Sequence, residues 1–201
     1  MEGRAGAGTA APAAYRMMTL ESILDTLPEY ARDLKLNLST LLRQAELTPQ
    51  QTWGTALAAA MAAGSPRLLR AVAAEAAKSL SPEAANGAKA AAAIMGMNNI
   101  YYRFTHLVEN PKYGTIPARL RMNVIRSHGA DPVDFELWCL AVSAINGCGA
   151  CMASHERAVR EKGVREETVA AAVRLASVIH AVAGVVEAEQ ALVPAEATPV
   201  P

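Results

Sequence analysis

The sequence predicts an all-α, multihelical protein, and three observations carry that prediction. Aromatic residues make up only 4% of the chain while alanine is heavily used, a composition that favours close-packed helices. No run of β-branched residues shows the period of two that marks a strand. Three N-cap residues are each followed by proline, as is typical of helix starts, at Thr48-Pro49, Ser81-Pro82 and Asp131-Pro132.

Start and stop signals place the helices in order along the chain. The first half predicts helices over residues 19–26, 29–37, 49–63, 66–80 and 82–107. Asn-Pro and Tyr-Gly pairs predict a loop over 110–115, followed by a short helix over 117–125 and a second loop over 127–130. The last three predicted helices cover residues 132–146, 148–162 and 165–192.

These helices predict one domain over residues 18–192. Hydrophobic residues make up 52% of the chain, enough to bury a sizeable core. Residues 1–17 are rich in glycine and alanine and lack the leucine-rich stretch of a secretory signal, so we expect a disordered leader. Residues 193–201 form a Pro/Ala tail that we also expect to be disordered.

A weak internal repeat suggests two similar helical halves. Sliding the chain by 85 positions (138 − 53) places Trp53 on Trp138 and repeats the order helix, turn, helix, long helix. The first copy has no cysteine where the second copy has its close pair; it has Ala63 and Pro66 instead. Ala-rich helices produce such matches easily, so duplication and chance both stay open at this point.

Charge and cysteine content exclude several classes of protein. Lys+Arg and Asp+Glu are both 19, so no basic excess predicts binding to nucleic acid or to anionic lipid. No stretch of 18 apolar residues runs without a polar or charged break, so we expect no membrane span. Three cysteines, an odd count with one close pair, are not the disulfide framework of a secreted domain. We expect a cytoplasmic protein with a redox-active or metal-binding pair.

The cysteine pair forms the chemical constellation of this sequence. Cys148 and Cys151 are three positions apart, and His155 follows four positions later, so the three share one face of a helix. The Asn146-Gly147 turn puts Cys148 at a helix start, where unpaired N–H groups and the helix dipole stabilise a thiolate. His155 adds a proton acceptor one turn from Cys151.

Glu136 is the candidate carboxylate. It lies one turn into the preceding helix among apolar residues, so we expect it to be half-buried and suited to proton transfer. If the tight Asn146-Gly147 turn makes the two helices neighbours, Glu136 faces the Cys/His side. Taken alone, Glu136 is also explained as an acid favoured by a helix N-terminus, and His155 as a solvated helix residue.

Structural zinc is the main alternative for the pair. Zinc takes four ligands, and here Cys148, Cys151 and His155 supply three, with Cys139 or Glu136 as the fourth. Cys139 by itself is explained as a small buried hydrophobe. Haem attachment needs a histidine directly after the second cysteine, where this chain has methionine. A thioredoxin-type domain needs strands before the motif, and a helix is predicted there.

The spacing Glu-x11-Cys-x2-Cys-x3-His, from Glu136 to His155, resembles the AhpD-type alkylhydroperoxidases. The resemblance covers about residues 19 to 191, and the matching stretches are residues 27–31, 35–38, 93–99, 120–123, 135–138, 141–148, 151 and 155–156. It implies an all-helical homotrimer of the AhpD/carboxymuconolactone decarboxylase superfamily. One departure is Ala150, because a family member carries histidine directly before the second cysteine.

The resemblance also implies roles for the site residues. Cys151 is the expected peroxidatic thiol and Cys148 the resolving one, with a Cys148–Cys151 disulfide after turnover. Glu136 and His155 are the expected proton relay. From the residues alone the assignment of the thiols stays open, because the helix dipole favours a thiolate at Cys148 while nearness to His155 favours Cys151.

The expected function is that of a lipoyl-dependent hydroperoxide reductase with no tightly bound cofactor. The resemblance implies reduction of the disulfide by lipoyl groups of dihydrolipoamide acyltransferase, fed by dihydrolipoamide dehydrogenase and NADH, and reduction of the peroxiredoxin AhpC. One alternative is a thiol-disulfide adapter with little peroxidase activity of its own. A second is a decarboxylase-like enzyme of the superfamily, against which the cysteine pair argues.

Overall fold

The computed structural model describes residues 19–193, which contain ten α-helices, one 3₁₀ helix and no strand. The predicted all-α class is therefore confirmed. The predicted leader, residues 1–17, lies outside the described residues. So does the predicted tail over 193–201, apart from Val193.

The first six segments follow the sequence prediction closely. They are α1 (Leu20–Asp25), the 3₁₀ helix η1 (Glu29–Ala31), α2 (Arg32–Leu41), α3 (Pro49–Ala63), α4 (Pro66–Ala76) and α5 (Pro82–Leu107). At the start of α3 the Thr48 hydroxyl accepts from the Gln51 N–H, and the Gln51 side chain accepts from the Thr48 N–H. This reciprocal cap satisfies two N–H groups that a helix start otherwise leaves unpaired.

The remaining segments are α6 (Lys112–Thr115), α7 (Val124–Ser127), α8 (Pro132–Ile145), α9 (Gly149–Glu161) and α10 (Glu166–Leu192). The sequence prediction is wrong between α5 and α8. A single helical turn, α6, lies in the predicted loop, and the predicted helix over 117–125 is absent until Val124. Arg119 has a φ of 52°, in the left-handed region, and a right-handed helix cannot continue through such a residue.

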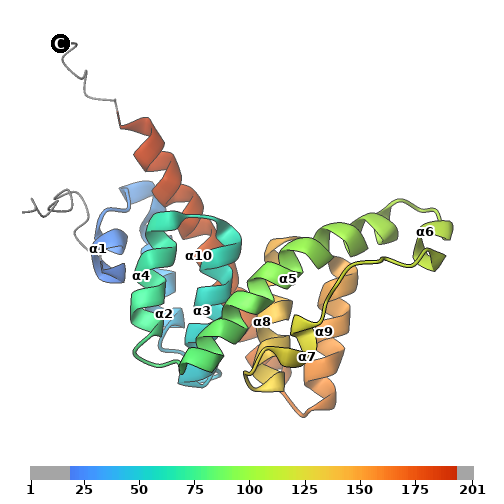
Figure 1. Ribbon diagram of the computed structural model, residues 1–201. Coiled ribbons are helices and arrows are strands. Elements are labelled where there is room, and N and C mark those ends of the chain that lie inside the picture. The colour runs from blue at the N-terminus through green and yellow to red at the C-terminus, as the bar shows by residue number, and fades with distance from the viewer. Residues whose placement is uncertain (1–18, 194–201) are drawn as a thin grey trace, which may run out of the picture.

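The core is built around α3 and α8, which pack on each other and on both long helices, α5 and α10 (Figure 1). Trp138 of α8 is fully buried there. A Cβ atom at Gly54 of α3 would lie 2.2 Å from the Trp138 ring. The absence of a side chain at Gly54 therefore sets how closely α3 approaches α8.

Two successive halves of the chain share one order of helices. The first half has α3, α4 and α5 with 15, 11 and 26 residues, and the second has α8, α9 and α10 with 14, 13 and 27 residues. The helix starts Pro49 and Pro132 correspond at a shift of 83 positions (132 − 49), not the 85 that the tryptophans indicated. At this register the counterpart of Cys148 is Ser65, and both residues cap a helix.

By length and composition alone, α10 is apolar enough to cross a membrane. In the fold it packs against α2, α3, α4 and α8, and residues along its length are buried in that core, from Ala171 to Val186. Burial of this kind is what a central helix of a globular domain requires.

Candidate active site

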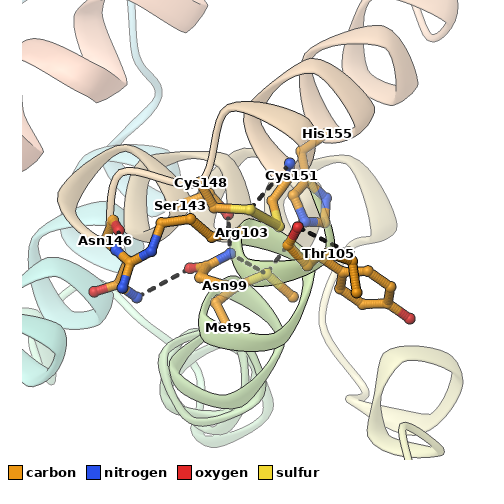
Figure 2. Close-up of a disulfide and its surroundings, with 10 residues drawn as sticks. Met95, Asn99, Arg103, Thr105, Ser143, Asn146, Cys148, Cys151 and His155 are labelled. Carbon is orange, nitrogen blue, oxygen red and sulfur yellow. Dashed lines mark hydrogen bonds between the residues drawn. A yellow bond between two sulfur atoms is a disulfide. The ribbon is translucent and has the colours of Figure 1, made fainter. Parts of the chain in front are cut away.

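The turn between α8 and α9 places the two cysteines. Gly147 has a φ of 67°, which glycine adopts without steric cost, and the Cys148 N–H donates to the Ser143 carbonyl at 3.1 Å. Cys148 is the N-cap of α9, and its Sγ accepts a hydrogen bond from the Cys151 N–H at 3.3 Å. A disulfide joins the sulfurs of Cys148 and Cys151 (Figure 2).

A pocket of about 310 Å³ lies beside the disulfide. Its lining comes from α5, α7 and α9, and consists of Met95, Asn98, Tyr102, Ile125, Ala150, Cys151, Ser154 and His155. Cys148 is not part of the lining and has no exposed surface, whereas Cys151 retains 7%. Cys151 is therefore the member of the pair that a molecule in the pocket contacts.

Glu136 of α8 and His155 of α9 meet at the edge of this pocket. His155 Nδ1 lies 2.6 Å from Glu136 Oε2, and both side chains are largely but not fully buried, with 15% and 30% exposed. In the tautomer with the proton on Nδ1, Glu136 Oε2 accepts from Nδ1–H, and Nε2 is the ring nitrogen left with a free lone pair. The tight α8–α9 turn thus brings together the two residues that the sequence proposed as neighbours.

Met95 of α5 is the other contact of the His155 ring. Its Sδ lies 3.2 Å from His155 Nε2, and the side chain is almost fully buried. Figure 2 shows Cys151 and His155 projecting from α9 toward Met95 on α5. Met95 Sδ therefore contacts the edge of the imidazole at Nε2, while Glu136 holds the ring at Nδ1.

A polar network attaches the α8–α9 turn to α5. Asn99 Nδ2 donates to Ser143 Oγ at 2.9 Å, and Asn146 Nδ2 donates to Asn99 Oδ1 at 2.9 Å. The Arg103 guanidinium donates to the Asn146 carbonyl, so the last residue before Gly147 is also held by α5 (Figure 2). These four side chains fix the position of the disulfide relative to the pocket wall on α5.

Sequence reasoning missed the α5 side of the site. Met95, Asn98, Asn99 and Tyr102 lie more than 40 positions before the cysteines, and only the packing of α5 on α8 and α9 brings them close. One signal was present, because two adjacent asparagines in an apolar, Ala-rich helix are costly to bury unless they have partners or a function.

Cys139 stands apart from this chemistry. It is a free thiol with no exposed surface, and burial raises its pKa well above the usual range, with the negative charge of Glu136 acting in the same direction. Within residues 19–193 no group of three or more His, Cys, Asp and Glu side chains is arranged to hold a metal ion. The zinc alternative therefore has no ligand set in the described part of the chain.

Comparison with known proteins places the chain in a family. It is 62% identical over 172 residues to the alkyl hydroperoxide reductase AhpD of Solibacter usitatus, covering 86% of this chain and 97% of that protein. It is 58% identical to the AhpD of Acidobacterium capsulatum and 53% identical to that of Streptomyces griseus, covering 86% and 87% of this chain and 95% and 99% of those proteins. The chain belongs to the AhpD family.

The model of the carboxymuconolactone decarboxylase family also matches this AhpD-family chain, over residues 111–194. That match includes the α8–α9 turn with Glu136, Cys148, Cys151 and His155. It does not include the pocket wall on α5, where Met95 and Asn98 lie. The relatives named AhpD match over most of the chain, which spans both sides of the pocket.

Proposed function

We propose that this protein is a dithiol hydroperoxide reductase, with Cys151 as the peroxidatic thiol and Cys148 as the resolving thiol. The observation that carries the proposal is the position of the two sulfurs. Cys151 lines the pocket one helical turn from His155. Cys148, the N-cap of α9, is fully buried and does not line the pocket. The names of the AhpD relatives support the same activity.

The proposed cycle has two chemical steps after reduction of the disulfide. The Cys151 thiolate attacks the outer oxygen of the hydroperoxide, the O–O bond breaks, and the alkoxide leaves as an alcohol after taking a proton. The resulting sulfenic acid at Cys151 reacts with the Cys148 thiol, which releases water and forms the disulfide. One hydroperoxide and two thiols thus give one alcohol, one water and one disulfide.

Glu136 and His155 act as the proton relay in this proposal. The 2.6 Å contact between His155 Nδ1 and Glu136 Oε2 orients the ring and stabilises the imidazolium that forms when Nε2 accepts the thiol proton. The same Nε2 then returns a proton to the departing alkoxide. General acid–base groups of this kind typically contribute about 10²–10⁴ to a rate.

The pocket lining favours organic hydroperoxides as substrates. Met95, Tyr102 and Ile125 surround the Cys151 side with apolar surface, which suits an alkyl group better than the fully solvated hydrogen peroxide. We therefore expect faster turnover with an alkyl hydroperoxide than with hydrogen peroxide at equal concentration.

Lipoyl groups are the proposed reductant, carried by dihydrolipoamide acyltransferase and recharged by dihydrolipoamide dehydrogenase with NADH. Cys151 is the cysteine of the disulfide that lines the pocket, so its sulfur is the one that a lipoyl thiol is proposed to attack. Exchange then passes through a mixed disulfide and leaves both cysteines reduced. By the same route the protein is proposed to reduce the peroxiredoxin AhpC. We propose that the present protein itself carries no tightly bound cofactor.

A cytoplasmic homotrimer is the proposed form of the protein. The distal part of α5 and the following α6 expose a set of large apolar side chains, namely Ile100, Phe104, Leu107, Val108, Tyr113 and Ile116. Phe104 and Tyr113 pack edge to face, and large exposed apolar side chains grouped on neighbouring segments are typical of contacts between subunits. Sedimentation of wild type beside Phe104→Glu tests the trimer, which we expect to dissociate in the variant.

The deciding experiment is peroxide-dependent NADH oxidation with lipoylated acyltransferase and dihydrolipoamide dehydrogenase. We expect turnover in wild type and loss of turnover in both Cys148→Ser and Cys151→Ser. Trapping of the sulfenic acid separates their roles, and label on Cys151 in Cys148→Ser is the expected result. Label on Cys148 alone, in the Cys151→Ser variant, would reverse the assignment.

The same assay distinguishes the adapter alternative. An adapter turns over slowly with free hydroperoxide and quickly once AhpC is added, and the exposed Gly149–Ala150 segment suits exchange with a partner protein. Wild type that is inactive with peroxide alone but active with AhpC would replace the peroxidase proposal with this one. Cys139→Ala serves as the control, because its buried thiol takes no part in either reaction.

A further inference from the structure

Asn98 of α5 lines the same pocket as Cys151 of α9. Met95, Asn98 and Tyr102 are three and four positions apart on α5, so they share one face of that helix. This face lines the pocket together with Cys151 and His155 of α9. A hydroperoxide in reach of Cys151 therefore lies against the α5 side chains as well.

The amide of Asn98 has an unused hydrogen-bonding atom. The residue is only 5% exposed, and no described residue donates a hydrogen bond to its Oδ1. A buried polar atom without a partner destabilises the folded state, and such atoms in native proteins call for an explanation. At a pocket wall the explanation is a ligand that supplies the missing partner.

The adjacent Asn99 gives the contrast. Its Nδ2 donates to Ser143 Oγ, and its Oδ1 accepts from Asn146 Nδ2, so both ends of that amide hold α5 to the α8–α9 turn. Asn99 is thus explained by structure, and Asn98 is not. The Asn98 oxygen is buried without a donor, and the residue belongs to the pocket lining, so a molecule in the pocket is the partner that remains for this amide.

We propose that the Asn98 amide binds the peroxide group of the substrate and stabilises the oxygen that leaves. This inference rests on the proposed hydroperoxide reductase function. Before the reaction the amide oxygen accepts the O–H of the hydroperoxide. As the Cys151 thiolate attacks the outer oxygen and the O–O bond breaks, negative charge develops on the alkoxide oxygen, and the amide N–H donates to it.

The division of labour follows from the chemistry of the groups. An amide does not transfer a proton, so Asn98 stabilises the developing charge while the Glu136–His155 pair supplies the proton that makes the alcohol. Asn98 also gives the hydroperoxide a fixed orientation, with the outer oxygen toward Cys151 and the alkyl group toward Ile125. Removal of one such donor from an enzyme site typically slows the chemical step by about 10²-fold or more.

The test compares two reactions of the same reduced thiol. Full-length protein is reduced, and the rate of disulfide formation with tert-butyl hydroperoxide is measured in a single turnover. The rate of alkylation at Cys151 by iodoacetamide is measured in parallel by mass spectrometry. Alkylation reports access to the pocket and the reactivity of the thiolate, but it has no peroxide bond for Asn98 to assist.

We expect Asn98→Ala and Asn98→Val to slow the peroxide reaction by about 100-fold or more while alkylation stays within about twofold of wild type. Two variants of different size separate loss of the amide from a change in pocket volume. Asn86→Ala, at an exposed position of the same helix, is the matched control and should change neither rate.

Each other outcome counts against a specific statement. Equal slowing of peroxide reaction and alkylation would mean that Asn98 only shapes the pocket, and unchanged peroxide rates would mean that it has no part in the reaction; either result overturns the inference. Failure of wild type to react with the hydroperoxide would instead overturn the proposed function, and the inference with it.

Discussion

The two halves of the molecule build the same helix start with different chemistry. In the first half Ser65 caps α4, and its Oγ accepts a hydrogen bond from the Leu68 N–H at 3.2 Å. In the second half Cys148 caps α9, and its Sγ accepts from the Cys151 N–H at 3.3 Å. The cap geometry that holds the disulfide is therefore a feature of the fold, present also where no redox chemistry takes place.

The counterparts of the proton relay differ in the same way. At the register of the helix starts, Val72 of α4 corresponds to His155, and Trp53 of α3 corresponds to Glu136. Val72 is completely buried in the core, whereas His155 lies at a pocket. The two halves thus share the helix cap, but only the second half has the cysteine pair, the histidine and the glutamate, next to a pocket.

Replacing Cys151 with leucine, the residue at the corresponding position 68 of α4, should have the largest effect on turnover. Cys151→Leu introduces the residue of the first half and removes the proposed nucleophile, so we expect hydroperoxide turnover to fall by at least about 10³-fold. Circular dichroism should report an unchanged helix content, because Leu68 is accommodated at the same position of α4. Turnover above a few per cent of wild type would break the assignment of Cys151.

His155→Val tests the relay in the same manner. We expect kcat/KM to fall by about 10²–10⁴-fold, because Nε2 can no longer accept the thiol proton or return it to the alkoxide. Glu156→Gln, next to it in sequence and outside the pocket lining, is the matched control and should keep its turnover. An equal loss in both variants would point to a disturbed α9 instead of a missing relay.

The first half should respond in stability instead of activity. Leu68 is completely buried, and Leu68→Ala should lower the free energy of unfolding by about 2–5 kcal/mol, as large-to-small core changes do. Denaturant unfolding measures the loss. Activity per folded molecule, corrected for the unfolded fraction, should remain near wild type. A selective loss of activity without a loss of stability would contradict this division between the halves.

The smallest effect is expected at the cap itself. Ser65→Ala removes the hydrogen bond to the Leu68 N–H and the 2.6 Å bond to Glu187, and should cost about 1 kcal/mol. Ser65→Cys places a sulfur at this cap. The variant should gain no peroxidase activity, because Leu68 and Val72 stand where the second half has its second cysteine and its histidine. Detectable peroxide turnover in a Ser65→Cys, Cys148→Ser, Cys151→Leu triple variant would show that a capping thiol is sufficient.

Local sequence signals predicted most helices, because each of these helices has its own N-cap residue and stop signal. Thr48-Pro49, Ser81-Pro82 and Asp131-Pro132 all begin helices in the structure. The segment between α5 and α8 failed because its course depends on the left-handed backbone of Glu109 and Arg119, residue types that seldom adopt it. The order of helices repeats at a shift of 83 and not the 85 that the tryptophans indicated, because the helix caps correspond and the tryptophans do not.

The candidate site was predictable only where its residues are close in sequence. Glu136, Cys148, Cys151 and His155 lie on two helices joined by one tight turn, so spacing alone brought them together. The spacing of residues along the sequence could not predict Asn98, because only the packing of α5 against α9 brings it to the site. The burial of its amide oxygen without a partner is a property of the folded state, not of the sequence.

The sulfur cap of α9 also determines how the molecule withstands repeated use. Cys148 holds the Cys151 amide through the same sulfur that opens and closes the disulfide. After reduction in the proposed cycle Cys148 carries a thiol, and a thiol sulfur still accepts a hydrogen bond, so the first turn of α9 keeps its cap when the disulfide opens. If the proposed cycle operates, we therefore expect irreversible oxidation of sulfur, and not unfolding, to limit the number of turnovers.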